Sequence, residues 1–235
     1  MMNIRPFNFS DRDYETAVAL RNELYPDNLS TVEIWKHNDL TRRQDPTYHF
    51  FVAENDAGEM QAFVQCALNN PKSKKLTFGL LANPACLKDG TAEQLMLAVE
   101  QVADTVTAEK LICKIQESEE EKVEFLSQDG FNIVMRYPIS ALNVAKFNLE
   151  AHQQRVNATL ENGIVVKQLP SGWQHDKGCQ QFVHELDWQL MLDVPSHEPR
   201  TKKSLEAFLT EEIFHPNAFP ESFFLAWEAD KAVGL

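Results

Sequence analysis

Alternating runs of apolar and polar positions divide the first half of the chain into short strands and amphipathic helices. Apolar residues recur with a period of about two in the strands and about 3.6 in the helices. Gly, Pro, Asn and Asp stand at the joins, where such residues commonly end an element. The predicted elements are a strand at 3–9, helices at 11–24 and 32–43, a hairpin at 48–68, a strand at 76–82, a helix at 91–107, a strand at 110–116, a helix at 117–128 and a strand at 131–142.

The same pattern begins again after Asn143–Glu161, a polar segment without proline or glycine that is predicted to be a helical connector. Two hairpin sequences, FFVAENDAGEMQAF and FFLAWEADKAVGL, share a Phe-Phe pair, an aliphatic residue, an alanine, a polar turn and a second apolar strand. Such self-similarity indicates a tandem repeat. The predicted elements of the second copy are a strand at 163–170, a largely helical stretch at 172–192, a helix at 201–214 and a hairpin at 221–235.

This order predicts an α/β (α+β) fold with a mixed central sheet flanked by helices, followed by a partial second copy. The expected division is a first domain at 1–144, a helical connector at 145–162 and the N-terminal part of a second domain at 163–235. The last predicted strand ends at Leu235 with no later partner. An open apolar strand favours aggregation, so we expect either a natural chain that continues or a sheet contact with another chain, as in a homodimer.

Composition and charge narrow the function classes. The 235 residues are 43% hydrophobic, and no apolar run approaches the ~20 residues of a membrane span. The N-terminus lacks an apolar signal core, and the four cysteines form no CxxC pair, so a cytoplasmic protein with reduced thiols is expected. A net charge of −13 disfavours binding of nucleic acids or anionic membranes and is compatible with a cationic substrate such as an amine.

Candidate chemistry lies in the loop Leu87–Ala92, LKDGTA, between an apolar strand and an amphipathic helix. Backbone N–H groups at a helix N-terminus bind anions such as phosphate, and the small residues Gly90 and Ala92 allow close approach. Asp89 would repel a phosphate unless it caps the helix, and an ordinary capped turn remains the alternative. Lysines that could supply positive charge are Lys72, Lys74, Lys75 and Lys88.

The element order and this loop resemble the GNAT acyltransferase family, whose corresponding pattern is Gln/Arg-x-x-Gly-x-Gly/Ala. Gly90 and Ala92 match the pattern and Leu87 does not, while Gly130-Phe131 resembles a further pair of the family. The resemblance implies acetyl-CoA as the acyl donor and no metal. It places the donor against a backbone N–H of the preceding strand and against the loop, that is, Leu80, Leu81, Ala82, Leu87, Lys88, Asp89, Gly90, Thr91 and Ala92.

The resemblance also implies direct attack by an unprotonated amine, with the strand N–H stabilising the oxyanion. The family's usual acid is a tyrosine four residues before the Gly-Phe glycine, where this chain has Leu126. Its asparagine seven residues earlier is replaced by Glu119. The first domain is therefore interpreted as a degenerate catalyst, with any acetyl transfer carried out by the continuation of the second. A non-catalytic module for ligand binding or dimerisation is the alternative.

The acceptor is expected to be a primary amine on a small molecule or peptide. The helical region after the first strand shapes the acceptor pocket in the family, and its candidates here are Trp35, Glu185, Trp188 and Asp193. Core packing is the alternative for both tryptophans. His175, Cys179 and His184 share one helical stretch, but three such ligands without a carboxylate make a weak metal motif.

Overall fold

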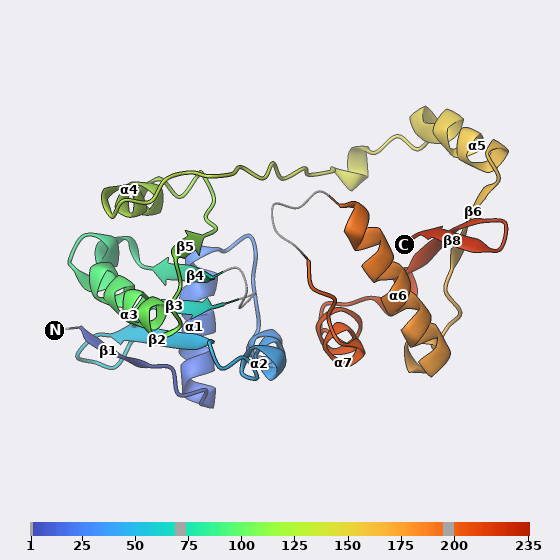
Figure 1. The fold of residues 1–235 in the computed structure, drawn as a ribbon. Helices are drawn as coiled ribbons and strands as arrows, with labels where there is room; N and C mark the ends of the chain where they lie inside the picture. Colours follow the sequence, from blue (N-terminus) through green and yellow to red (C-terminus); the bar gives the residue numbers. More distant parts are fainter. Residues whose placement is uncertain (1, 69–73, 195–199) are drawn as a thin grey trace. The chain divides into compact units, whose positions relative to one another are not determined.

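The chain forms two compact units, residues 1–132 and 133–235, each described here by itself. The computed structural model describes residues 2–68, 74–194 and 200–235, and Figure 1 shows the elements in chain order. Lys72, one of the lysines considered for phosphate binding, lies outside the described residues.

The first unit is a five-stranded mixed sheet in the order β1-β2-β3-β4-β5. Neighbouring strands are antiparallel except for β4 and β5, which are parallel. A parallel pair requires a crossover, and α3 supplies it. The elements are β1 (Asn3–Pro6), α1 (Asp11–Leu24), α2 (Val32–Arg42), β2 (His49–Glu54), β3 (Met60–Ala67), β4 (Lys75–Ala82), α3 (Thr91–Thr105), β5 (Lys110–Cys113) and α4 (Glu120–Gln128).

Two hydrophobic cores lie on opposite faces of this sheet because successive strand residues face opposite sides. On β4, Leu76 and Leu80 pack in the core formed with α3 and α4, whereas Leu81 packs in the core formed with α1 and α2. Burying a large aliphatic side chain stabilises by about 1.5–3 kcal/mol. The mixed sheet between helical layers agrees with the predicted fold class.

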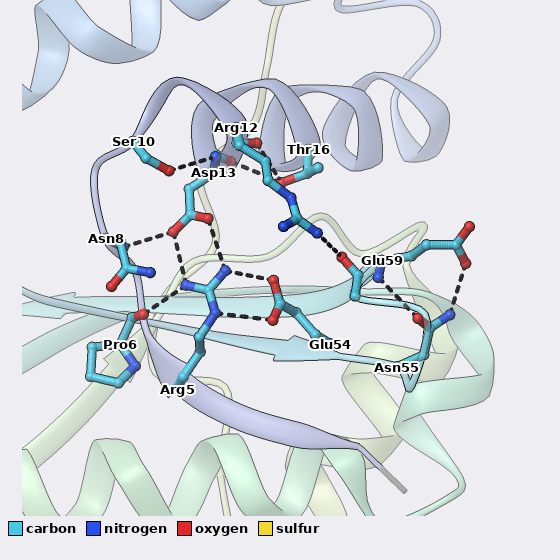
Figure 2. A network of polar contacts seen from close by, with 11 residues as sticks. Arg5, Pro6, Asn8, Ser10, Arg12, Asp13, Thr16, Glu54, Asn55 and Glu59 are labelled. Atoms are coloured by element: carbon cyan, nitrogen blue, oxygen red, sulfur yellow. Dashed lines mark hydrogen bonds and ion pairs between the residues drawn. The ribbon is translucent and has the colours of Figure 1, made fainter.

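A polar network around Arg5 fixes the start of α1 against β1 and β2 (Figure 2). Its guanidinium donates two hydrogen bonds of 2.8 Å to Asp13, and its Nε donates one of 3.0 Å to Glu54. The Asn8 N–H adds a 2.7 Å bond to Asp13, and Ser10 caps the helix. Asp13 is buried, so these donors compensate the cost of removing its charge from water.

The second unit contains a three-stranded antiparallel sheet in the order β6-β7-β8. Its small core includes Trp173, Val183, Phe208 and Ile213. The predicted strand, helices and hairpin form in the predicted order. The elements are α5 (Gln153–Glu161), β6 (Ile164–Gln168), α6 (Lys177–Asp193), α7 (Leu205–Phe208), which continues as a π-helical turn at Leu209–Ile213, β7 (Phe224–Glu228) and β8 (Lys231–Gly234).

The predicted strand at 131–142 is wrong, since no helix or strand forms in the described stretch from 129 to 143. Its apolar side chains lie in solvent, with Ile133, Val134 and Ile139 exposed by 61%, 85% and 87%. An alternating pattern is compatible with a strand, but a strand also needs a partner for its backbone groups. Phe131 alone joins the core, against Phe78 at 5.6 Å.

Three other boundaries differ from the prediction. The first strand ends at Pro6 rather than residue 9, because Phe9 adopts a left-handed turn conformation with φ 55°. The connector at 143–161 is α-helical only from Gln153, after short 3-10 turns at Val144–Lys146 and Glu150–His152. The helix predicted from residue 201 begins at Leu205, where the Ser204 side chain caps it.

Candidate functional site

The pairing between β4 and β5 ends halfway along β4. Their paired residues run only from Lys75–Lys110 to Phe78–Cys113, whereas β4 continues to Ala82 beside β3. The side chain of Cys113, the last residue of β5, accepts a hydrogen bond from the Leu80 N–H. The parallel ladder therefore ends in an opening at the carboxyl end of β4.

The three β4 residues predicted to face the acyl donor do not all direct their N–H groups to the same side of the strand. The Asn83 N–H donates to Gln61 O of β3 at 3.0 Å. Because N–H groups of an extended strand point alternately to its two sides, the Leu81 N–H also points toward β3. The N–H groups of Leu80 and Ala82 point toward the opening, and Cys113 already contacts the first of them.

The loop between β4 and α3 combines a 3-10 turn at Pro84–Leu87 with a left-handed glycine. Gly90 has φ 88°, and a Cβ placed there would meet nothing within 4 Å. Gly90 is the N-cap residue of α3, and Asp89 Oδ1 accepts the Thr91 N–H at 2.9 Å across it. The backbone has room for an anion beside Gly90, but Asp89 uses one of the donors.

Two of the lysines considered for phosphate binding are held by carboxylates, Lys88 in the loop and Lys74 at the opposite, amino end of β4. Lys88 forms a 2.7 Å ion pair with Glu121 of α4, and Lys74 forms one of 2.5 Å with Glu109. Leu87, which departs from the expected Gln or Arg, packs against the core under α3 and α4. Thr91 and Ala92 are buried at the start of α3. Recognition of an anion here would rest on main-chain N–H groups.

A polar cluster of Tyr25, Glu119 and Lys122 lies where α4 begins, and we call it the Tyr25–Glu119–Lys122 cluster. Tyr25 follows α1, and its hydroxyl donates to Glu119 Oε1 at 2.5 Å. Lys122 Nζ donates to the same hydroxyl at 3.1 Å and to Glu119 Oε1. The Gln116 N–H donates to Glu119 Oε2 at 3.1 Å.

Burial and these contacts set the protonation of each member. Burial raises the pKa of Tyr25, Glu119 raises it further and Lys122 opposes them. Burial alone would lower the pKa of Lys122, but the bonds to Glu119 and Tyr25 hold it above its usual value. Burial likewise opposes ionisation of Glu119, whose donors nonetheless keep its pKa low. At neutral pH the cluster holds a phenol, an ammonium and a carboxylate.

The cluster joins residues from the two sides of the sheet. The Tyr25 ring packs with the α1–α2 core, while Lys122 belongs to α4 on the other face. The side chain of Cys113 accepts the Leu80 N–H, and on the pKa of this thiol Lys122 and Glu119 have small, opposite effects. Burial raises the pKa of Cys113 to about 11, so it is a protonated thiol at neutral pH.

Sequence reasoning missed two members of the cluster. Tyr25 directly follows the helix predicted at 11–24, and Lys122 lies inside the helix predicted at 117–128. The i,i+3 spacing of Glu119 and Lys122 was the available signal. Leu126 is buried in the core, so its position supplies no polar group.

The four residues predicted for the acceptor fall in different units. Trp35 of α2 packs edge-on against Phe63 at 5.5 Å, a core contact. Glu185, Trp188 and Asp193 all lie on α6 in the second unit. Glu185 pairs with Lys202, and Asp193 is the exposed last residue of the helix.

The histidines considered for metal binding have other partners. The His175 ring stacks on Phe214 at 5.9 Å, and His184 Nε2 lies 3.0 Å from Lys203 O. Over the residues that the structure describes, no three or more His, Cys, Asp or Glu side chains gather as metal ligands do. Within the same ranges no helix is long and apolar enough to cross a membrane.

Comparison with known proteins gives one family and one recurrent fold. Residues 14–131, half of the chain, match the profile described as Acetyltransferase (GNAT) family. A crystal structure described as a phosphinothricin N-acetyltransferase is 18% identical with TM-score 0.50, covering 61% of this chain and 90% of its own. An aminoglycoside 6'-N-acetyltransferase from Acinetobacter baumannii is also 18% identical, with TM-score 0.48 over 61% and 99% of the two chains. No curated protein sequence matches.

Proposed function

We propose that this chain, which belongs to the acetyltransferase (GNAT) family, transfers an acetyl group from acetyl-CoA to a primary amine of a small molecule or peptide. The observation that carries the proposal is the opening of β4 next to the glycine loop of α3. There the strand continues past its last pair with β5, Phe78–Cys113, and leads directly into the loop at Gly90.

The loop would hold the pyrophosphate of the donor. Main-chain N–H groups at the start of α3 supply hydrogen bonds, and the helix dipole adds a favourable field. Gly90 leaves open space where a side chain would stand. The small residue Ala92 and the neighbouring Leu87, Lys88, Asp89 and Thr91 complete this proposed site.

The Ala82 N–H would stabilise the negative charge that develops on the carbonyl oxygen. Such a donor is effective because it is fixed before the reaction and lies in a partly dry site. Ala82 is buried, and the alternation of β4 directs its N–H toward the opening. A neutral amine could then attack the activated thioester without a covalent enzyme intermediate.

The second unit is proposed to be a partial copy of the first, with its own candidate residues for acceptor recognition. Its strand, helix pair and hairpin follow one another as β1, α1, α2, β2 and β3 do. Glu185 and Asp193 of α6 are the candidates for holding a cationic amine, with Trp188 on the same helix and Trp35 in the related region of the first unit.

A non-catalytic module is the second candidate, favoured by the internal pairing of the loop. Lys88 is bound to Glu121 and the Thr91 N–H to Asp89, so a donor would have to compete with contacts already present. Under this alternative the fold would bind a ligand or a second chain without turnover.

Thermal unfolding with and without acetyl-CoA tests the proposal. A ligand at 100 times its Kd stabilises by about 2.7 kcal/mol, which raises Tm by a few degrees. We expect this shift in the wild type and its loss in Gly90→Asp. Gly130→Asp is the matched control, because Gly130 also has φ 88° and open space but lies after α4.

Three outcomes separate the candidates. A shift that Gly90→Asp removes and Gly130→Asp retains, together with CoA release in the presence of amines, supports the acetyltransferase. The same shift without CoA release favours the binding module. Absence of any shift in the wild type contradicts acetyl-CoA binding by this chain.

A further inference from the structure

We infer that the side-chain amide of Gln65 binds a neutral oxygen atom of the acceptor, such as an amide carbonyl or a hydroxyl, beside Gly79 of β4. The inference rests on the proposed acetyl transfer and adds a substrate class to it. Gln65 of β3 is the register partner of Gly79, and Gly79 directly follows Phe78, which forms the last pair with β5. Strand register therefore places this amide where the opening of β4 begins.

Gln65 and Gly79 face the side of the sheet that carries α1 and α2. Opposed residues of an antiparallel pair share a face, and the same face recurs at every second residue. Phe63 and Leu81, two positions away on each strand, pack in the core formed with α1 and α2. Gln65 and Gly79 are themselves partly exposed, so this stretch of the face is accessible to a small molecule.

The missing side chain at position 79 leaves the amide uncovered. A Cβ placed on Gly79 would lie 3.8 Å from both Cγ and Nε2 of Gln65, an ordinary contact distance. The amide nitrogen therefore borders space over β4 that a larger residue would fill. It carries two N–H donors, and an oxygen atom of an acceptor that entered this space would be within their reach.

Tyr48 directs the amide nitrogen toward Gly79. Its hydroxyl lies 3.2 Å from Gln65 Oε1 and 3.2 Å from Asp39 Oδ1. Because the hydroxyl donates to Oε1, the amide nitrogen is turned away from Tyr48. Asp39 is held in the interior by a 2.8 Å bond from the Tyr14 hydroxyl. Tyr48 is thus a positioning residue that acts through Gln65.

A neutral oxygen suits this amide better than a carboxylate. Removing a charge from water costs free energy unless an opposite charge compensates it, and Gln65 carries no charge. The guanidinium of Arg42 is engaged with Asp39, at 3.9 Å. The proposed oxyanion donor, the Ala82 N–H, lies three residues further along β4, which is about 10 Å. The acceptor is therefore an amine that carries a carbonyl or hydroxyl oxygen several bonds from its nitrogen.

The test compares two primary amines of similar length, ε-aminocaproamide and heptylamine, of which only the first has a carbonyl group. CoA release gives kcat/KM for each amine, calorimetry gives Kd for acetyl-CoA, and circular dichroism establishes folding. Gln65→Leu removes the donor, and Gln101→Leu makes the same change at an exposed site on α3 as the matched control. Gly79→Val fills the space beside the amide at a position without a left-handed φ.

We expect wild type and Gln101→Leu to prefer ε-aminocaproamide by about fivefold in kcat/KM, the size of one neutral hydrogen bond. Gln65→Leu should lose this preference, with unchanged kcat/KM for heptylamine and unchanged Kd for acetyl-CoA. Tyr48→Phe should reduce the preference without slowing heptylamine, because the amide is no longer oriented. Gly79→Val should lower kcat/KM for both amines by about tenfold, because it occupies space that the acceptor needs.

Retention of the preference in Gln65→Leu would overturn the inference and leave the proposed function standing. Equal use of the two amines by the wild type, or full activity of Gly79→Val on both, would do the same. A wild type that binds acetyl-CoA but acetylates neither amine would overturn the inference alone. A wild type that does not bind acetyl-CoA would overturn the proposed function as well.

Discussion

The Nζ of Lys122 lies 3.1 Å from the hydroxyl of Tyr25, although 97 positions separate the two residues. Lys122 is 6% exposed, so its ammonium depends on Glu119 and Tyr25 in place of water. This contact joins the end of α1 to α4 and brings together groups that have no proximity in sequence. Its strength can be measured independently of any activity.

Replacing Lys122 with methionine should destabilise the first unit by about 3 kcal/mol, because it leaves the partly buried Glu119 without its cation. Adding Glu119→Gln should recover part of that loss, giving a coupling above about 0.5 kcal/mol in a double-mutant cycle. Urea unfolding of the wild type, the two single variants and the double variant measures this coupling free energy. Strictly additive effects would mean that the pair contributes nothing specific.

Glu121→Gln should tighten acetyl-CoA binding by about threefold, since it releases Lys88 from an exposed ion pair that contributes little to stability. Glu120→Gln removes the same charge from the neighbouring exposed position and is the control. Kd is measured by calorimetry at low and moderate salt. An equal gain in affinity in both variants would show that the effect comes from removing a negative charge and not from releasing Lys88.

Leu95→Ala on α3 should cost about 2–5 kcal/mol, because this fully buried side chain leaves a cavity between α3 and the sheet. Leu97→Ala, on the same helix and 55% exposed, should change stability by less than about 0.5 kcal/mol. Denaturant unfolding compares them. Similar losses in the two variants would contradict the packing of α3.

Asp13→Asn should destabilise by about 2 kcal/mol near pH 6, through loss of charge-assisted bonds from Arg5 (Figure 2). Burial opposes ionisation of Asp13, but Arg5 and the Asn8 N–H hold its pKa below the usual value. The contribution is therefore present above the unfolded-state pKa of about 3.9 and is lost as pH falls through the lower folded-state pKa.

Unfolding free energies of wild type and Asp13→Asn, measured from pH 6 to pH 2.5, check this sign. The gap between them should narrow below about pH 4. Asp27→Asn, at an exposed site, should lie within about 0.5 kcal/mol of wild type at pH 6. A gap independent of pH would show that the Asp13 carboxylate contributes through shape alone.

The local hydrophobic pattern was sufficient to predict most helices and strands, because side chains are buried with the same periods of about two in strands and about 3.6 in helices. The alternation in LTFGLLA became β4, with even residues toward α3 and Leu81 toward α1 and α2. The glycine loop was also found, since Gly90 and the following helix are local features. The bond from the Thr91 N–H to Asp89 could not be read from the sequence, because the loop sequence is compatible with either a free or a bonded carboxylate.

The local hydrophobic pattern failed where the structure of a segment, or the partner of a side chain, depends on residues far away in the sequence. The stretch 131–142 alternates like a strand but has no strand beside it. Tyr25 and Lys122 gave no sign of their contact, because a side-chain bond across the fold leaves no local period. The pairing of Lys88 with Glu121, 33 positions apart, was hidden for the same reason.

The separation of Tyr25 from α4 also determines when the Tyr25–Glu119–Lys122 cluster can assemble during synthesis. A nascent chain presents α1 long before residue 122 leaves the ribosome, so Tyr25 must wait for its partners. Closing so long a loop costs entropy that only later contacts repay. The hairpin of β2 and β3 can form early, whereas the Tyr25–Glu119–Lys122 cluster can form only after α4 has been made.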